Sequence, residues 1–291
     1  MKPLETPKPL PLPGGTPAGS SARILFTAAA GVGALLGATS AAWAGLQHQA
    51  DVAARAIGDA AADPPRRDGV YLPNGDYADD GGSGTYRTDR PLLMAMLGDS
   101  TSAGYGADDA DGLPGVMLAR ELAERVDRPV RLSTHATVGS RSADLNRQAR
   151  EVLLEQPDLV VIVVGANDVR DRVSPVFATR MLTEAIDLLT ARGVAVVVGS
   201  CPDLGVIEPI PQPLRQLAGS WSRRLAWMQE RAAVKAGARA VSISRLVSPD
   251  FRHHPDFFSR DRFHPSGRGY RRAVEELLPA AIAAVAEPAS H

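Results

Sequence analysis

The sequence predicts an α/β domain in which strands and helices alternate about five times. Two observations lead to this fold class. Short, uninterrupted apolar runs, clearest at 92–97 and 159–164, stop abruptly at or near a glycine that polar residues follow. Longer segments with apolar residues at helical spacing lie between these runs. A short apolar run bounded by turn residues is typical of a strand buried on both faces, as in a parallel sheet covered by helices.

The other elements follow in order from local signals. The segment at 113–126 has its apolar residues on one side of a helix. A serine cap opens the helix at 142–154, and a Ser-Pro pair at 174–175 opens the next helix, because proline is favoured at the first helical position. Glycines at 193 and 237 end two helices. The expected strands are 92–97, 129–135, 158–164, 194–199 and 240–244, and the expected helices are 113–126, 142–154, 174–192, 214–236 and 267–285.

Strands that alternate with helices imply a parallel sheet with helices on both faces. Right-handed crossovers then favour a three-layer α/β/α, flavodoxin-like arrangement of five parallel strands in the order 2-1-3-4-5. The folded domain is predicted to span residues 91–286. In such a sheet, functional groups collect at the carboxyl ends of the strands.

The N-terminal third has a different composition. Residues 1–22 are rich in proline and are expected to form a disordered leader. Residues 24–46 carry no charge and are long enough to span a bilayer as a helix, so we predict that 23–46 forms a hydrophobic signal anchor. The basic residues before it place the N-terminus in the cytoplasm and the folded domain outside the cell membrane.

The anchor has an alternative. An A-x-A sequence at 42–44 is typical of a signal-peptide cleavage site, and cleavage after Ala44 would give a secreted protein. Residues 47–90 are predicted to be a stalk and a linker rich in proline, glycine and aspartate.

Charge and cysteine content exclude some functions. The formal net charge is −1 and the isoelectric point is about 6.6, which argues against a nucleic-acid partner because nucleic-acid binding needs a basic surface. Cys201 is the only cysteine, so no internal disulfide can form. We interpret it as a small buried residue beside a strand, with a nucleophilic thiol as the alternative.

A serine mechanism is the chemistry that the strand ends favour. Ser100 follows the first strand, and a hydroxyl becomes a good nucleophile only when a base takes its proton. His264 can be that base if a carboxylate holds its other ring nitrogen, and Asp261 lies three residues earlier. Attack on an ester carbonyl also creates an oxyanion, for which the backbone N–H groups of Ser100 and Gly139 and the side-chain amide of Asn167 are candidate donors.

The same residues form a family pattern. The segments GDS at 98–100, Gly139, GAND at 165–168 and DRFH at 261–264 resemble, in this order, the four blocks of the SGNH (GDSL-type) hydrolases. The resemblance covers about residues 91–285. That family comprises esterases, lipases and carbohydrate-ester deacetylases that act without a metal or other cofactor.

The resemblance implies a role for each residue. Ser100 would be the nucleophile and first oxyanion donor, with Gly139 and Asn167 as the other donors. His264 would be the base, with Asp261 behind it. Asp99 and Asp168 we interpret as acceptors of hydrogen bonds in their loops.

The substrate and two other functions stay open. The implied substrate is a small-molecule, lipid or carbohydrate ester. The loop at 200–213 and the segment at 249–259, with Phe251, Phe257 and Phe258, are expected to wall the pocket and to favour acyl chains. One alternative is a metal-dependent phosphoesterase, although this chain has too few histidines to bind two metal ions. The other is a non-catalytic binding module tethered to the envelope.

Overall fold

The chain divides into two compact units, Met1–His48 and Gln49–His291. In the first unit, residues 43–48 are described and are helical, and in the second unit residues 49–53 are helical. The predicted leader and most of the predicted anchor at 23–46 lie outside the described residues and stay predictions. Within the described part of the chain, no helix is both long and apolar enough to cross a membrane. The computed structural model describes residues 43–53, 55, 64–79 and 90–286.

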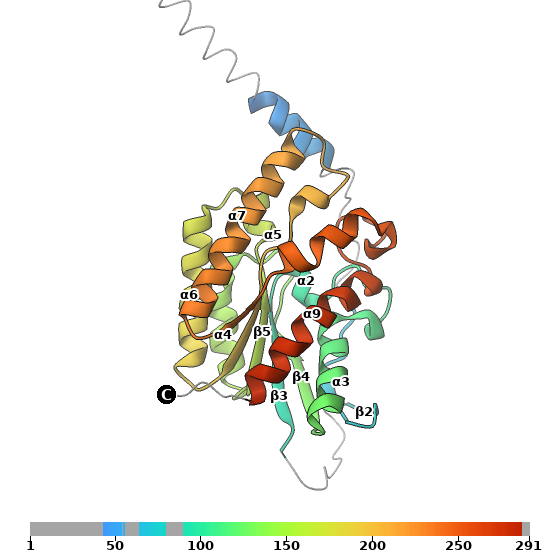
Figure 1. Ribbon diagram of the computed structural model, residues 1–291, viewed down its shortest axis with the longest axis vertical. Coiled ribbons are helices and arrows are strands. Elements are labelled where there is room, and N and C mark those ends of the chain that lie inside the picture. The colour runs from blue at the N-terminus through green and yellow to red at the C-terminus, as the bar shows by residue number, and fades with distance from the viewer. Residues whose placement is uncertain (1–42, 54, 56–63, 80–89, 287–291) are drawn as a thin grey trace, which may run out of the picture. The chain divides into compact units, whose positions relative to one another are not determined.

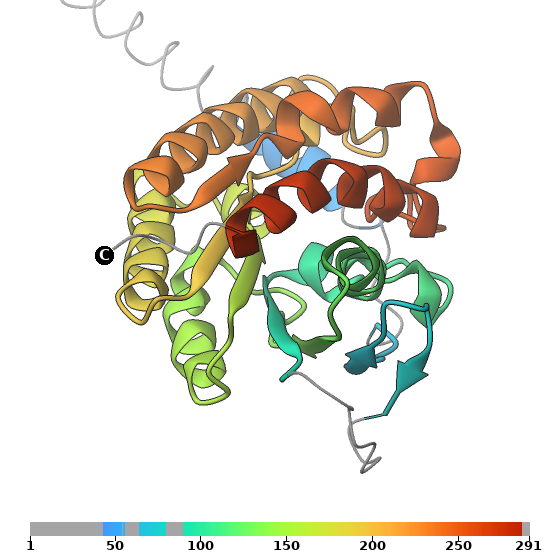
Figure 2. The same ribbon diagram turned by 60° about the horizontal axis from the view of Figure 1, so that its bottom comes forward.

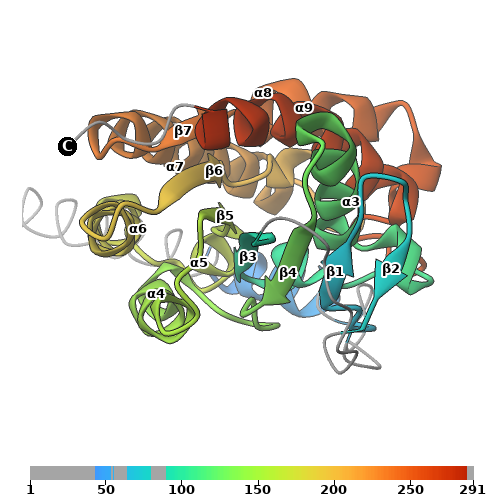
Figure 3. The ribbon, with the colours of Figure 1, turned by 90° about the horizontal axis from the view of Figure 1, so that it is seen from below.

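The second unit contains a mixed sheet of seven strands (Figures 1 and 3). Five of these strands are parallel, and they follow the predicted order 2-1-3-4-5. The strands are β1 (Gly69–Tyr71), β2 (Tyr77–Ala78), β3 (Leu92–Gly98), β4 (Val130–Thr134), β5 (Leu159–Val163), β6 (Ala195–Gly199) and β7 (Arg239–Val241). Across the sheet they run β2-β1-β4-β3-β5-β6-β7.

The prediction of a purely parallel, five-stranded sheet is wrong at one edge. β1 pairs antiparallel with β4, and β2 pairs antiparallel with β1. Both strands lie within the segment 47–90, which was expected to be a stalk and linker. Three and two residues are too few to show a strand period, and the surrounding proline and glycine dominate the composition. Asp68 ties this edge to the sheet, because its carboxylate accepts hydrogen bonds from the N–H and hydroxyl of Thr134 at 3.2 and 2.7 Å.

Helices cover both faces of the sheet. α3 and α9 lie side by side on one face (Figure 2), whereas α4 and α6 lie on the other (Figure 3). The helices are α2 (Ser100–Ala103), α3 (Pro114–Val126), α4 (Leu145–Leu153), α5 (Ala166–Arg170), α6 (Pro175–Thr190), α7 (Leu214–Lys235), α8 (Ile243–Leu246) and α9 (Gly267–Ala286). Short 3₁₀ helices are η1 (Ala110–Gly112), η2 (Ser142–Asp144), η3 (Leu204–Val206), η4 (Ser248–Arg252) and η5 (Pro255–Phe257).

Successive residues of the central strand β3 serve two separate cores. Met94 and Met96 pack in the cluster that includes α3 and α9, whereas Ala95 and Leu97 pack in the cluster that includes α4 and α6. Burial on both faces explains why this strand is an uninterrupted apolar run instead of an alternating one.

The end of β3 is crowded against β5. Gly98 has a φ of +127°, and it stands opposite Val163 in the parallel register. A Cβ atom at this position would lie 1.9 Å from the carbonyl oxygen of Val163. The position therefore requires glycine both for its backbone conformation and for the close approach of the neighbouring strand.

We predict that Gly98→Ala lowers the free energy of unfolding by at least about 3 kcal/mol, because the new methyl group displaces β5 as well as straining the backbone. Gly75→Ala is the matched control, since Gly75 has a φ of +88° with nothing within 4 Å of the new Cβ. Backbone strain alone should cost the control about 1–2 kcal/mol. Urea unfolding of both variants checks this, and equal losses would contradict the role of the close approach.

Candidate active site

Ser100 stands directly beyond the carboxyl end of β3, as the first residue of α2. Asp99 caps this helix, because its Oδ1 accepts a hydrogen bond from the N–H of Thr101 at 2.9 Å. Ser100 is buried, with 5% of its surface exposed. Its backbone N–H donates to no other described residue, as is usual in the first turn of a helix.

A chain of two hydrogen bonds joins three of the predicted residues. Ser100 Oγ lies 3.0 Å from His264 Nε2, and His264 Nδ1 lies 2.6 Å from Asp261 Oδ2. An ionised carboxylate can only accept, so Nδ1 carries the ring hydrogen and Nε2 is left to accept the hydrogen of the Ser100 hydroxyl. This arrangement has the geometry needed for proton transfer from the serine to the histidine.

Asp261 is held by more than the imidazole ring. Its Oδ1 accepts hydrogen bonds from the N–H groups of Phe263 and His264 and from the hydroxyl of Ser259, at 2.8, 2.9 and 2.8 Å. Burial raises the pKa of Asp261, but the hydrogen bonds, above all that from the His264 ring, outweigh it and lower the pKa to about 2. Asp261 is therefore ionised at any pH near neutrality.

Aromatic rings confine the imidazole of His264. The ring of Tyr105 meets it edge-on with centroids 4.5 Å apart, and the ring of Phe263 does so at 4.9 Å. The hydroxyl of Tyr270, on α9, donates to the carbonyl oxygen of Tyr105 at 2.6 Å. The position of His264 thus depends on the loop after α2 and on the last helix.

The two other predicted donors lie beyond β4 and β5, at the same edge of the sheet. Gly139 has a φ of +84° with open space around it, and its N–H donates to no other described residue. Asn167, on α5, is 7% exposed, and its Nδ2 donates to the carbonyl oxygen of Ser140 at 2.9 Å. That bond uses one of the two amide hydrogens and leaves the other for a further acceptor.

Gln148 also belongs to this region, and it is not among the residues predicted from the sequence. Its Oε1 accepts from the N–H of Gly98 at 2.8 Å, and its Nε2 donates to the carbonyl oxygen of Gly98 at 3.0 Å and to Ser140 Oγ at 3.3 Å. One signal was available. Gln148 occupies a buried position on the apolar side of α4, between Leu145 and Val152, where an amide needs a specific partner.

Asp99 and Asp168 act as hydrogen-bond acceptors between the loops. Asp99 Oδ2 accepts from the N–H of Gly165 at 3.3 Å, and Asp168 Oδ2 accepts from the N–H and hydroxyl of Ser142 at 3.0 and 2.9 Å. Burial raises the pKa of both carboxyl groups, that of Asp99 to about 6. The contacts agree with the interpretation of these residues as loop acceptors.

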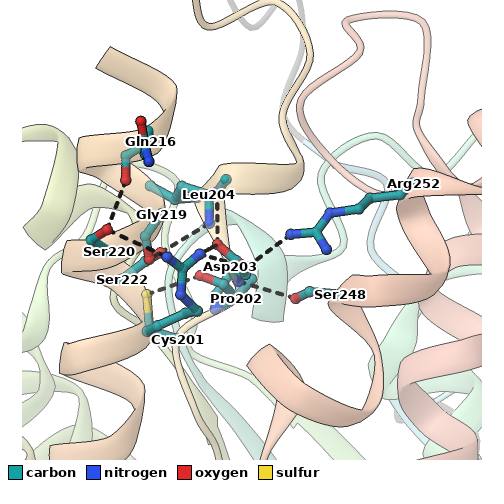
Figure 4. A network of polar contacts seen from close by, with 12 residues as sticks. Cys201, Pro202, Asp203, Leu204, Gln216, Gly219, Ser220, Ser222, Ser248 and Arg252 are labelled. Carbon is teal, nitrogen blue, oxygen red and sulfur yellow. Dashed lines mark hydrogen bonds and ion pairs between the residues drawn. The ribbon is translucent and has the colours of Figure 1, made fainter. Parts of the chain in front are cut away.

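The loop after β6 is held by a buried carboxylate (Figure 4). Asp203 lies within 3.0 Å of the Arg223 guanidinium and 3.5 Å of the Arg252 guanidinium, and its N–H donates to Ser248 Oγ at 3.0 Å. These contacts join the loop to α7 and η4. The loop and the segment that follows α8 are therefore braced against one another.

Cys201 lies at the start of this loop and is fully buried. Its N–H donates to Gln229 Oε1 at 2.8 Å, and burial raises the pKa of its thiol well above the usual range. A thiol that stays protonated is a poor nucleophile, so the contacts favour the structural interpretation of Cys201.

The three phenylalanines expected to wall the pocket pack on one another and on the core. Phe251 meets Phe257 and Phe258 edge-on, with centroids 5.4 and 4.9 Å apart. A small cavity of about 120 Å³ borders Phe251 and Phe258 together with Arg262. These rings therefore cover the core, and two of them also border this cavity beside the loop of His264.

Comparisons with known proteins agree with the fold and the blocks. Residues 96–272 match the GDSL-like Lipase/Acylhydrolase family. The chain is 42% identical over 231 residues to the GDSL-like esterase Rv1075c of Mycobacterium tuberculosis, which covers 77% of this chain and 71% of that protein.

Two solved structures share the fold at low identity. The lipase/acylhydrolase from Enterococcus faecalis is 22% identical with a TM-score of 0.52, over 68% of this chain and 99% of that one. The acetylxylan esterase Axe2 from Geobacillus stearothermophilus, as a catalytic mutant, is 17% identical with a TM-score of 0.52, over 67% of this chain and 96% of that one.

The α/β fold and these likenesses define an ester hydrolase. The chain belongs to the GDSL-like lipase/acylhydrolase family.

The raised pKa of Asp99 predicts a pH dependence of stability between about pH 4 and pH 6. The folded-state pKa is about 6, above the usual value near 3.9 for an unfolded chain. As the pH rises through this window, the unfolded chain loses the proton first, so the contribution of Asp99 lowers the free energy of unfolding. The total loss is about 2–3 kcal/mol, absent below pH 4 and complete above pH 6.

Urea unfolding from pH 4 to pH 7 checks this prediction in the wild type and in Asp99→Asn, whose side chain does not titrate. The stability of the wild type relative to the variant should fall across the window. Parallel pH profiles would contradict the assignment, whatever the absolute stability of the variant.

Proposed function

We propose that this ester hydrolase is a serine esterase that cleaves carboxylic esters, of an acyl lipid or an acylated carbohydrate, through an acyl-enzyme and without a cofactor. The observation that carries the proposal is the continuous hydrogen-bonded chain from Ser100 Oγ through the His264 ring to Asp261, at 3.0 and 2.6 Å. The similarity to an esterase at 42% identity supports an ester as the substrate class.

The first half of the reaction forms the acyl-enzyme. His264 Nε2 takes the hydroxyl proton as Ser100 Oγ attacks the ester carbonyl carbon, and the carbonyl oxygen gains the negative charge. When this tetrahedral intermediate collapses, the bond from carbon to the alcohol oxygen breaks. His264 returns its proton to that oxygen, and the alcohol leaves.

The second half releases the acid. His264 takes a proton from a water molecule, whose oxygen attacks the acyl carbon, and collapse of the second intermediate breaks the bond to Ser100 Oγ. The proton returns to Oγ and the carboxylic acid departs. Asp261, ionised because its pKa is about 2, stabilises the imidazolium ion that forms in both halves.

The oxyanion would be stabilised by donors from three loops. The N–H groups of Ser100 and Gly139 donate to no other described residue, and the Asn167 amide has one hydrogen to spare. Donors fixed before the reaction need no reorganisation when the charge develops.

The same proposal places the catalytic domain outside the cytoplasmic membrane, on the strength of the uncharged segment 24–46 alone. Recovery of the protein solely from the cytosolic fraction of cells would contradict this placement.

We predict that Ser100→Ala lowers kcat for p-nitrophenyl esters by at least about 10⁴-fold, because it removes the nucleophile. Wild-type turnover should persist in EDTA. Ser220→Ala, at an exposed serine of α7 whose hydroxyl donates to the carbonyl oxygen of Gln216 and accepts a hydrogen bond from Arg223, is the control and should keep full activity. A chain-length series from acetate to palmitate measures both the loss and the preferred acyl group.

Covalent labelling by a serine-directed phosphonate separates this proposal from a binding module. The wild type should be labelled and Ser100→Ala should not. Turnover that survives the mutation would refute the assignment of Ser100, and loss of activity in EDTA would favour a metal-dependent phosphoesterase. Neither turnover nor labelling in the wild type would favour the binding module.

We predict that Asn167→Ala lowers kcat by about 10²–10³-fold with little change in KM, because its amide donates to the transition state and not to the bound ester. Asn167→Asp keeps the shape but has no hydrogen to donate at neutral pH, so it should lose at least as much. Asn74→Ala, in the exposed turn between β1 and β2, is the control. An Asn167→Ala protein with near-normal kcat would remove this residue from the oxyanion site.

A further inference from the structure

A cavity of about 210 Å³ lies beside the candidate active site. Ser102 and Ala103 line it, and both belong to α2, the helix that begins with the proposed nucleophile. Thr137 and Val138 line it as well, and they directly precede Gly139 in the loop after β4. The cavity is therefore flanked by the two elements that carry the nucleophile and an oxyanion donor.

The inner wall of the cavity is aliphatic. Leu113 and Val116, at the start of α3, and Leu132, on β4, line it and are almost completely buried. Such a wall offers no hydrogen bond to a sugar or an alcohol, whereas it gains free energy from contact with methylene groups. The acyl chain is the part of an ester that fits it.

The rim of the cavity is charged and comes from the segment 64–68. Arg67 is already paired with Asp111 at 2.9 Å, and Asp68 accepts both of its hydrogen bonds from Thr134. Arg66 differs. Its Nη1 lies 3.5 Å from the carbonyl oxygen of Thr134, another lining residue, and it forms no ion pair with any described residue.

We propose that this cavity is the acyl subsite and that it takes an aliphatic acyl chain ending in a carboxylate. The methylene groups contact the aliphatic wall at Leu113, and the terminal carboxylate pairs with Arg66. The inference rests on the proposed esterase function. It also assigns selectivity to a segment that precedes residues 96–272, the part of the chain that matches the family.

Two six-carbon substrates test the proposal, 4-methylumbelliferyl hexanoate and the mono-4-methylumbelliferyl ester of adipic acid. They differ only in a terminal methyl group or carboxylate. Arg66→Gln should lower kcat/KM for the adipate ester about threefold to tenfold and leave the hexanoate ester nearly unchanged. Arg66→Lys should recover part of the loss, and raising the salt concentration should shrink the wild-type preference for adipate because the pair is partly exposed.

Two further variants complete the test. Arg192→Gln, at an exposed arginine beyond the end of α6, is the charge control and should change neither substrate. Val116→Phe fills the inner wall and should lower kcat/KM for both six-carbon esters while the acetate ester is spared. If Val116→Phe does not fold, the Arg66 variants still decide the matter, because Arg66 is exposed.

The outcomes separate the two proposals. If the wild type hydrolyses both esters and Arg66→Gln leaves the ratio of their kcat/KM values unchanged, the subsite is refuted and the esterase stands. If the wild type hydrolyses no ester and is not labelled by the phosphonate, the esterase proposal itself fails.

Discussion

β3 extends two residues beyond the last residue that pairs with β4, and the site depends on what bonds the backbone there. β3 pairs with β4 only as far as Met96, whereas its pairing with β5 continues to Gly98. The backbone groups of Gly98 that face away from β5 therefore have no strand to bond. Gln148 satisfies both of them from α4, and the N–H of Thr137 adds a bond at 3.2 Å. Leaving such buried groups unpaired would cost about 1–3 kcal/mol each.

The same amide links the strand ends to one another. Gln148 also bonds Ser140 Oγ, and the carbonyl oxygen of Ser140 receives the amide of Asn167. The segments after β3, β4 and β5 thus share a single buried hydrogen-bond network. Ser140 is its central residue, and Gly139 directly precedes Ser140. A network of this kind holds donors in position before the substrate arrives, which is the condition for stabilising a developing charge.

The features that could be predicted from the sequence are those with a local signal. The buried parallel strands are recognisable in the sequence as apolar runs, and Ser100 and His264 lie in blocks with a recognisable pattern. β1 could not be predicted because three residues show no period, and its pairing partner β4 lies far along the chain. Gln148 is a similar case, since its odd position on an apolar helix face indicates a partner without saying which one. Arg66 gives no local signal, because only the folded chain brings it to the cavity.

Ser100 and His264 are positioned by different means, and this difference shows where their geometry is determined. Ser100 follows a strand held on both sides, whereas His264 lies in a loop that folds around its own Asp261. Neither element sets the distance between them. That distance depends on the contact between the loop after α2 and the loop of His264. At this contact the backbones are so close that a Cβ atom at Gly106 would lie 2.6 Å from the carbonyl oxygen of Pro265. The bond from Tyr270 to Tyr105 secures the same contact from α9. The 3.0 Å separation of nucleophile and base is therefore a property of tertiary packing at this contact, to which both tyrosines contribute.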